Sequence, residues 1–117
     1  MMPCYNRDAD SLSCTIQAPL RPFKQEQIIV VENANAAHRR TGTRQANRDI
    51  DPAICCIWSP MGSKALTQYV GSLAARKYHY IVTTNDDVGL PDNFVAPHHL
   101  PGDKVIGWCL PVSAINA

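Results

Sequence analysis

The fold is decided by residues 51–84, which read DPAICCIWSPMGSKALTQYVGSLAARKYHYIVTT. The stretch opens with an apolar run, passes a tight turn, continues with apolar residues at helical spacing and ends in a second apolar run. The helical spacing is i, i+3, i+4, i+7 and i+8, and its members are Leu66, Tyr69, Val70, Leu73 and Ala74. This pattern predicts an amphipathic helix over about 60–77 with one buried apolar stripe.

The apolar runs on either side of this helix have the composition of β-strands. They are expected at Ala53–Trp58 and at Tyr78–Thr84. Two strands joined by a helix of this length usually lie parallel in one sheet, either adjacent or with another strand between them. At the helix start, Ser59 followed by Pro60 matches an N-cap with proline at the first helical position, and Ser63 is the alternative cap if the turn is longer.

The rest of the chain supplies shorter elements. Gln27–Glu32 is a β-branched run without alternation, so it is predicted to be a central strand. Further strands are expected at Ser13–Ile16 and Lys104–Leu110. In the basic segment Asn33–Asp51, residues Asn35–Arg40 could form a helical turn or two ended by Gly42, and the rest is expected to be a mobile loop. The predicted fold is a single α+β domain over residues 1–117, with a mixed sheet of about four to five strands, one main helix on one face, and an extended N-terminal arm at residues 1–24.

Composition restricts the class of protein. The chain has 117 residues, of which 45% are hydrophobic and 18% charged, and this fits one globular domain. Its net charge of +1 provides no global field toward nucleic acid or acidic membranes, so any such attraction has to be local. Five cysteines without a C-x-x-C pair, and no apolar signal segment or membrane-spanning run, indicate a cytoplasmic protein without a disulfide framework.

The turn before the helix is the first candidate site. The start of a helix presents unpaired N–H groups and the positive end of a dipole, so it can bind an anion. The residues expected to contribute are Trp58, Ser59, Gly62, Ser63 and Lys64. The turn lacks the glycine spacing of a P-loop. The alternative interpretation is an ordinary capped helix with a solvated lysine.

Asp86 and Asp87 follow the second strand of the same unit. If the two strands are parallel, these carboxylates reach the same edge of the sheet as the turn. There they could bind a cation or a hydroxyl-rich ligand, or act as a base. Turn formation is the alternative explanation for an Asn-Asp-Asp sequence.

A thiol-nucleophile enzyme is the second hypothesis. It combines Cys55 or Cys56 with His98 or His99 as base and one of the two aspartates as orienting group. Adjacent cysteines on a strand point to opposite faces, so at most one of them can serve. The ligand spacings typical of structural zinc are missing, so neither a metal site nor a cofactor is predicted.

The third hypothesis is nucleic-acid binding through a local arginine cluster consisting of Arg39, Arg40, Arg44 and Arg48. Arginines of this kind can pair phosphates bidentately. The cluster is short, lacks interleaved aromatic residues and belongs to a nearly neutral chain, which favours a solvated loop.

The sequence favours a non-catalytic binding protein. We expect it to hold a small anionic or polar molecule, or a protein partner, and to act as a homo-oligomer whose N-terminal arm adds to a neighbour's sheet edge. No membrane partner is expected.

Overall fold

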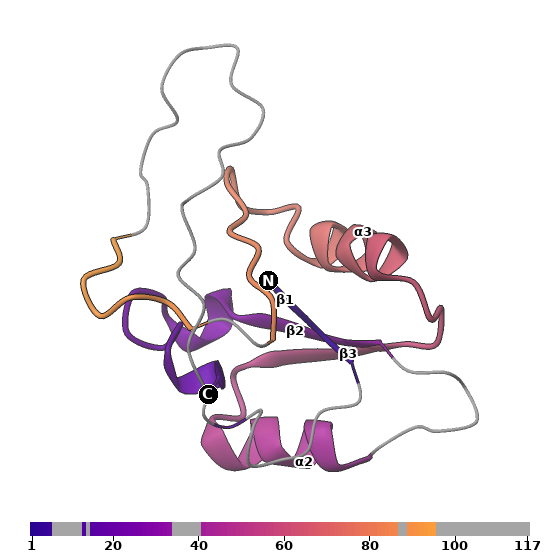
Figure 1. Ribbon diagram of the computed structural model, residues 1–117, viewed down its shortest axis with the longest axis horizontal. Helices are drawn as coiled ribbons and strands as arrows, with labels where there is room; N and C mark the ends of the chain where they lie inside the picture. The colour runs from indigo at the N-terminus through magenta and orange to yellow at the C-terminus, as the bar shows by residue number, and fades with distance from the viewer. Residues whose placement is uncertain (6–12, 14, 34–40, 87–88, 96–117) are drawn as a thin grey trace.

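Three parallel strands form the centre of the molecule (Figure 1). They are β1 (Met2–Cys4), β2 (Ile29–Asn33) and β3 (Cys55–Ser59), and they lie in the order β1-β2-β3. The computed structural model describes residues 1–5, 13, 15–33, 41–86 and 89–95. Mixed helix and strand content is therefore confirmed, but the described part holds three strands, fewer than predicted, and all of their pairings are parallel.

The central strand β2 explains why the sheet is buried on both sides. All five of its residues are buried, as the β-branched run predicted. Alternate side chains point to opposite faces of a strand, so Val30 joins a cluster on one face with Met2 and Cys4, while Ile29 and Val31 pack on the other. A strand with two apolar faces needs a covering layer on each.

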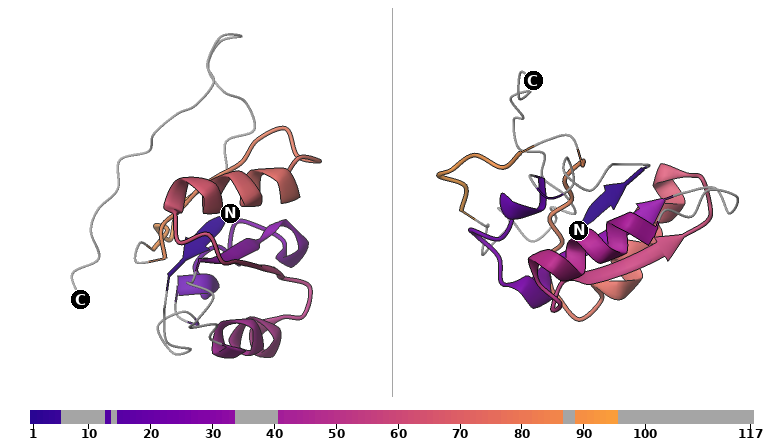
Figure 2. Two further views of the ribbon diagram at one scale, coloured as in Figure 1. Left: turned by 90° about the vertical axis from the view of Figure 1, so that its right-hand side faces the viewer. Right: turned by 90° about the horizontal axis from the view of Figure 1, so that it is seen from below.

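Helices supply both covering layers. Figure 2 shows the sheet between α2 (Thr41–Ile50) and α3 (Lys64–Ala74). A short 3-10 helix, η1 (Gln25–Gln27), precedes β2. One main helix on one face was predicted, but residues 41–50, expected to be part of a loop, form a second helix on the other face. The sequence of α2 lacks an apolar stripe. This helix covers the sheet through Ile50 and the buried amide side chain of Asn47.

The main helix is shorter than predicted and rotated. It begins after Ser63 and ends at Ala74, and its fully buried positions are Thr67 and Gly71. Val70 and Ala74 pack against the sheet as expected, but the other three members of the predicted stripe are exposed: Leu66, Tyr69 and Leu73.

Gly71 accounts for this rotation. A Cβ atom at this position would lie 3.2 Å from Cγ2 of Val31 and would collide with the thioether of Met1. The glycine therefore lets the helix backbone approach β1 and β2 closely, and the bulkier side chains of the same helix turn outward.

Residues 82–84 return to the sheet beside β1, although they do not form a regular strand as predicted for Tyr78–Thr84. The backbone nitrogen of Met1 donates to the carbonyl of Val82 at 2.7 Å, and the amide of Thr84 donates to the carbonyl of Met1 at 3.1 Å. This is the hydrogen-bond pattern of a parallel pair. The chain thus crosses from β3 over β2 to the far side of β1.

The first residues are not an extended arm. Met2 and Cys4 are buried in the sheet, and residues 15–17 are helical, with Ile16 fully buried in the core. The strand predicted at Ser13–Ile16 is therefore wrong as well. The strand predicted at Lys104–Leu110 lies outside the described residues. No helix in the described part of the chain is long and apolar enough to cross a membrane.

Replacing Gly71 tests the close helix–sheet contact. We expect Gly71→Leu to lower the free energy of unfolding by about 1–3 kcal/mol, because an over-packed contact has to be forced open. Ala65→Leu adds a side chain to an exposed position of the same helix and should change stability by less than about 0.5 kcal/mol. Urea denaturation of both variants measures the difference, and equal stabilities would contradict the packing described here.

Candidate functional site

A cavity of about 390 Å³ lies where the carboxyl ends of the strands meet. Two of the three strands contribute residues to it. The end of β1, the end of β2, the turn before α3 and the segment after residue 84 supply the described lining, which consists of Pro3, Cys4, Tyr5, Asn33, Gly62, Lys64, Asn85 and Asp86. Apolar and polar groups share the lining, with one cation and one carboxylate among them.

The turn before α3 is shaped by Gly62 and Ser63. Gly62 has φ of 62°, in the left-handed region that glycine adopts without a steric cost. Ser63 is the N-cap: its hydroxyl accepts a hydrogen bond from the amide of Leu66, and its carbonyl accepts one from the amide of Thr67. The later of the two caps considered from the sequence is therefore the one formed, and Ser59 ends β3 instead.

This cap leaves the start of the helix facing the cavity. The first N–H groups of a helix have no partner within it, and those of Leu66 and Thr67 are taken by Ser63. Within the described residues, no partner is found for the amides of Lys64 and Ala65, which lie at the positive end of the helix dipole. Gly62 and Lys64, on either side of the cap, both line the cavity.

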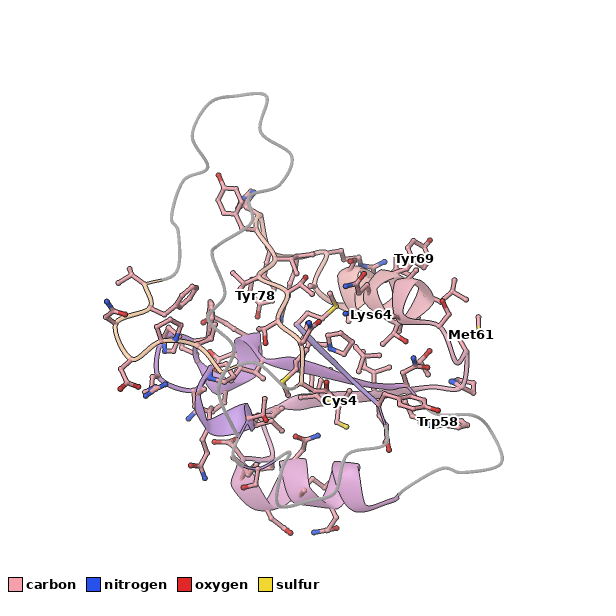
Figure 3. All side chains as sticks on the ribbon, viewed as in Figure 1. Cys4, Trp58, Met61, Lys64, Tyr69 and Tyr78 are labelled. Atoms are coloured by element: carbon pink, nitrogen blue, oxygen red, sulfur yellow. The ribbon has the colours of Figure 1, made fainter. Side chains whose placement is uncertain are left out.

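Lys64 connects the turn to the far side of the cavity. Its ammonium group donates a hydrogen bond of 2.8 Å to Oδ1 of Asn85. An ammonium group has three donors, so this contact holds the side chain in place while two donors stay free for another acceptor. Figure 3 labels Lys64 beside α3 and Cys4 in the sheet below it.

Asp86 is held from two sides. Its carboxylate accepts a hydrogen bond of 3.2 Å from the amide of Tyr5, and its carbonyl accepts one of 3.1 Å from the hydroxyl of Thr15. These contacts fix the residue after the 82–84 segment against the end of β1. A carboxylate in this place can accept hydrogen bonds from hydroxyl groups.

Asn33 brings a buried amide to the same cavity. It is the last residue of β2, it is 7% exposed, and its Oδ1 has no hydrogen-bond partner among the described residues. A buried polar atom without a partner costs about 1–3 kcal/mol. One explanation for such an atom is a bound group that supplies the missing hydrogen bond.

The structure therefore brings together three of the residues singled out in the sequence, Gly62, Lys64 and Asp86, around one cavity. Trp58, Ser59 and Ser63 lie next to it in the chain but are not part of its described lining. Asp87 lies outside the described residues.

Within the described residues, neither cysteine of the proposed thiol site lies beside Asp86. Cys55 is exposed at the amino end of β3, and Cys56 accepts a 3.2 Å hydrogen bond from the buried amide of Asn47 on α2. Both are at the opposite end of the strand from Asp86. His98 and His99 lie outside the described residues, and so do Arg39 and Arg40. Arg44 and Arg48 belong to α2, and Arg48 is exposed.

Sequence reasoning missed Asn33, Asn85 and Tyr5. Each directly follows or ends an apolar run, so a signal was present: in parallel sheets the residues at strand ends share one edge. The run beginning at Met1 was not recognised as a strand because it is short. In the described part of the chain no group of three or more His, Cys, Asp or Glu residues could hold a metal ion.

Comparison of the chain with protein-family models, with curated proteins and with solved structures finds no match. Its function has to be inferred from the geometry of the cavity.

Proposed function

We propose that this protein binds a small phosphorylated molecule of the nucleotide class in the cavity at the carboxyl end of its sheet. The phosphate would bind Lys64 and the start of α3. The hydroxyl-bearing part of the molecule would bind Asn33 and the carboxylate of Asp86.

The path of the chain supports this location. From β1 the chain adds β2 and then β3 on one side, and then crosses to residues 82–84 on the other side of β1. The crossover directions reverse at β1, and ligands of open parallel sheets bind outside the carboxyl ends of the strands at such a point. The same reversal beside the first strand occurs in the 3-2-1-4-5-6 order of dinucleotide-binding sheets.

The size and chemistry of the cavity agree with such a ligand. A volume of about 390 Å³ falls in the range of small-molecule sites. The free donors of Lys64 and of the helix start suit a phosphate. The carboxylate of Asp86 repels phosphate but accepts hydrogen bonds from hydroxyl groups. The two charges therefore orient the ligand with its phosphate at Lys64 and its hydroxyl groups at Asp86.

The observation that carries the proposal is the buried amide of Asn33. Asn33 lines the cavity and its amide oxygen has no partner among the described residues, so a hydroxyl or amino group of a ligand that reached this buried oxygen would supply the missing donor. An amide that served only the core would be costly compared with an apolar residue of the same size.

No observation favours one of the other two functions. The homo-oligomer was expected from an N-terminal arm over residues 1–24, and residues 2–4 of that segment form β1 instead. The hypothesis of a cysteine-dependent enzyme is weakened because Cys55 and Cys56 lie at the opposite end of β3 from Asp86. Of the arginine cluster, only the side chain of Arg48 is described.

Calorimetric titration with ADP, GDP, CDP and UDP tests the proposal. We expect at least one of them to bind, and Lys64→Gln to weaken that binding by about tenfold or more, since a hydrogen bond to a charged group is worth about 1.5–3 kcal/mol. Lys77→Gln, which removes an exposed lysine beyond the other end of α3, should leave binding unchanged. Absence of binding to all four nucleotides would refute the proposal.

Asn33→Leu separates a binding role from a structural one. Leucine keeps a similar volume and removes the unpartnered amide, so we expect stability to be unchanged or higher. Nucleotide affinity should nevertheless fall by about tenfold, because the ligand loses its partner. Thermal unfolding and calorimetry on the same sample measure the two quantities. A variant that loses stability and keeps its affinity would show that Asn33 serves the fold.

A further inference from the structure

The side of α3 that faces away from the sheet is apolar and exposed. Leu66, Tyr69 and Leu73 form this α3 outer face, with exposed fractions of 42%, 62% and 49%. Their i, i+3, i+7 spacing places them in one line along the helix. Figure 3 shows Tyr69 pointing away from the sheet. Exposed apolar groups arranged in this way mark an interaction surface more often than scattered ones do.

Apolar side chains on both sides of the helix in sequence are exposed as well. Met61, in the turn before α3, is 55% exposed, and Tyr80 and Ile81, in the segment after it, are 45% and 41% exposed. The chain therefore presents apolar side chains before, along and after the helix that forms the outermost layer on this side of the sheet (Figure 2).

The charge of the same region has one sign. Residues 52–85 contain Lys64, Arg76 and Lys77 but no aspartate or glutamate. Lys64 binds Asn85 at the cavity, whereas Arg76 and Lys77 are exposed directly after the helix, one turn beyond Leu73. Two exposed cations thus follow the α3 outer face in the chain, with Nζ of Lys77 5.0 Å from the centre of the Tyr78 ring, and a partner that complements them has to be anionic.

We propose that the α3 outer face docks on an anionic lipid surface. Apolar side chains that penetrate the boundary between head groups and acyl chains, together with cations that pair lipid phosphates, are the two attractions that hold a helix in the plane of a membrane. Tyrosine suits this boundary because one end of its ring is apolar and the other is polar. The attraction is local, in keeping with a net charge of +1 for the whole chain.

The shape and charge of this surface make other partners less suitable. The apolar side chains stand on a convex helix, which a deformable lipid interface accommodates without a preformed groove. A second copy packed parallel would bring Arg76 and Lys77 of one helix against those of the other, with no acidic residue from residues 52–85 to compensate. Nucleic acid would offer phosphates but no apolar environment for leucine.

Co-sedimentation of the full chain with lipid vesicles tests this proposal. Vesicles are made of phosphatidylcholine alone or of an equimolar mixture of phosphatidylcholine and phosphatidylserine. We expect partitioning onto the mixed vesicles to be about tenfold or more stronger and to fall with added salt. The triple variant Leu66→Gln, Tyr69→Gln, Leu73→Gln should lose most of this binding, whereas Val95→Gln, which replaces an exposed apolar residue elsewhere, should keep it.

A charge series separates the two attractions. Arg76→Gln with Lys77→Gln should abolish the preference for phosphatidylserine, and Lys24→Gln with Arg48→Gln, which removes two exposed cations away from α3, should leave it intact. Thermal unfolding confirms that each variant is folded. Equal partitioning onto both kinds of vesicle overturns the proposal. The proposal is also overturned if the triple variant keeps its vesicle binding, or if that variant changes its solution mass without a change in lipid binding. A protein that binds polyglutamate in preference to vesicles overturns it as well.

Discussion

The candidate site depends on one parallel contact, the pairing of residues 82–84 with the start of β1. Without it, the chain after α3 would have no fixed place, and Asn85 and Asp86 would not meet the turn that starts α3. Two backbone hydrogen bonds at Met1 set the register, and the amide of Tyr5 and the hydroxyl of Thr15 then hold Asp86. The hydrogen bond between Lys64 and Asn85 attaches the same segment to the start of α3.

Close packing of α3 makes this contact reachable. Because Gly71 lets the helix lie directly on β1 and β2, the chain leaves α3 close enough to β1 to pair with it. The same packing sets the orientation of the helix. Its capped start lies at the cavity, cations follow its last turn, and leucine and tyrosine face away from the sheet. One small residue thus connects the proposed ligand site with the proposed lipid-binding face.

The sequence predicted the parts of the fold that have a strong local signal. β2 and β3 were found within a few residues because their apolar runs are β-branched and bounded by polar residues, and Gly62 and Lys64 were placed at the turn by helix-cap chemistry. The buried face of α3 was predicted wrongly because hydrophobicity alone assigns Leu66 and Tyr69 to the core. Close approach of the helix to the sheet at Gly71 instead favours small residues on the buried face. β1 and α2 were missed because a three-residue strand and a polar helix obtain their stability from tertiary contacts, which no local pattern reports.

The pairing of residues 82–84 with β1 can be measured directly by nuclear magnetic resonance in solution. Our account predicts nuclear Overhauser contacts between the backbone protons of residues 1–2 and those of residues 83–84, together with slow exchange of the amide proton of Thr84. A rapidly exchanging Thr84 amide without those contacts would contradict it, because Asn85 and Asp86 would then have no fixed position opposite Lys64.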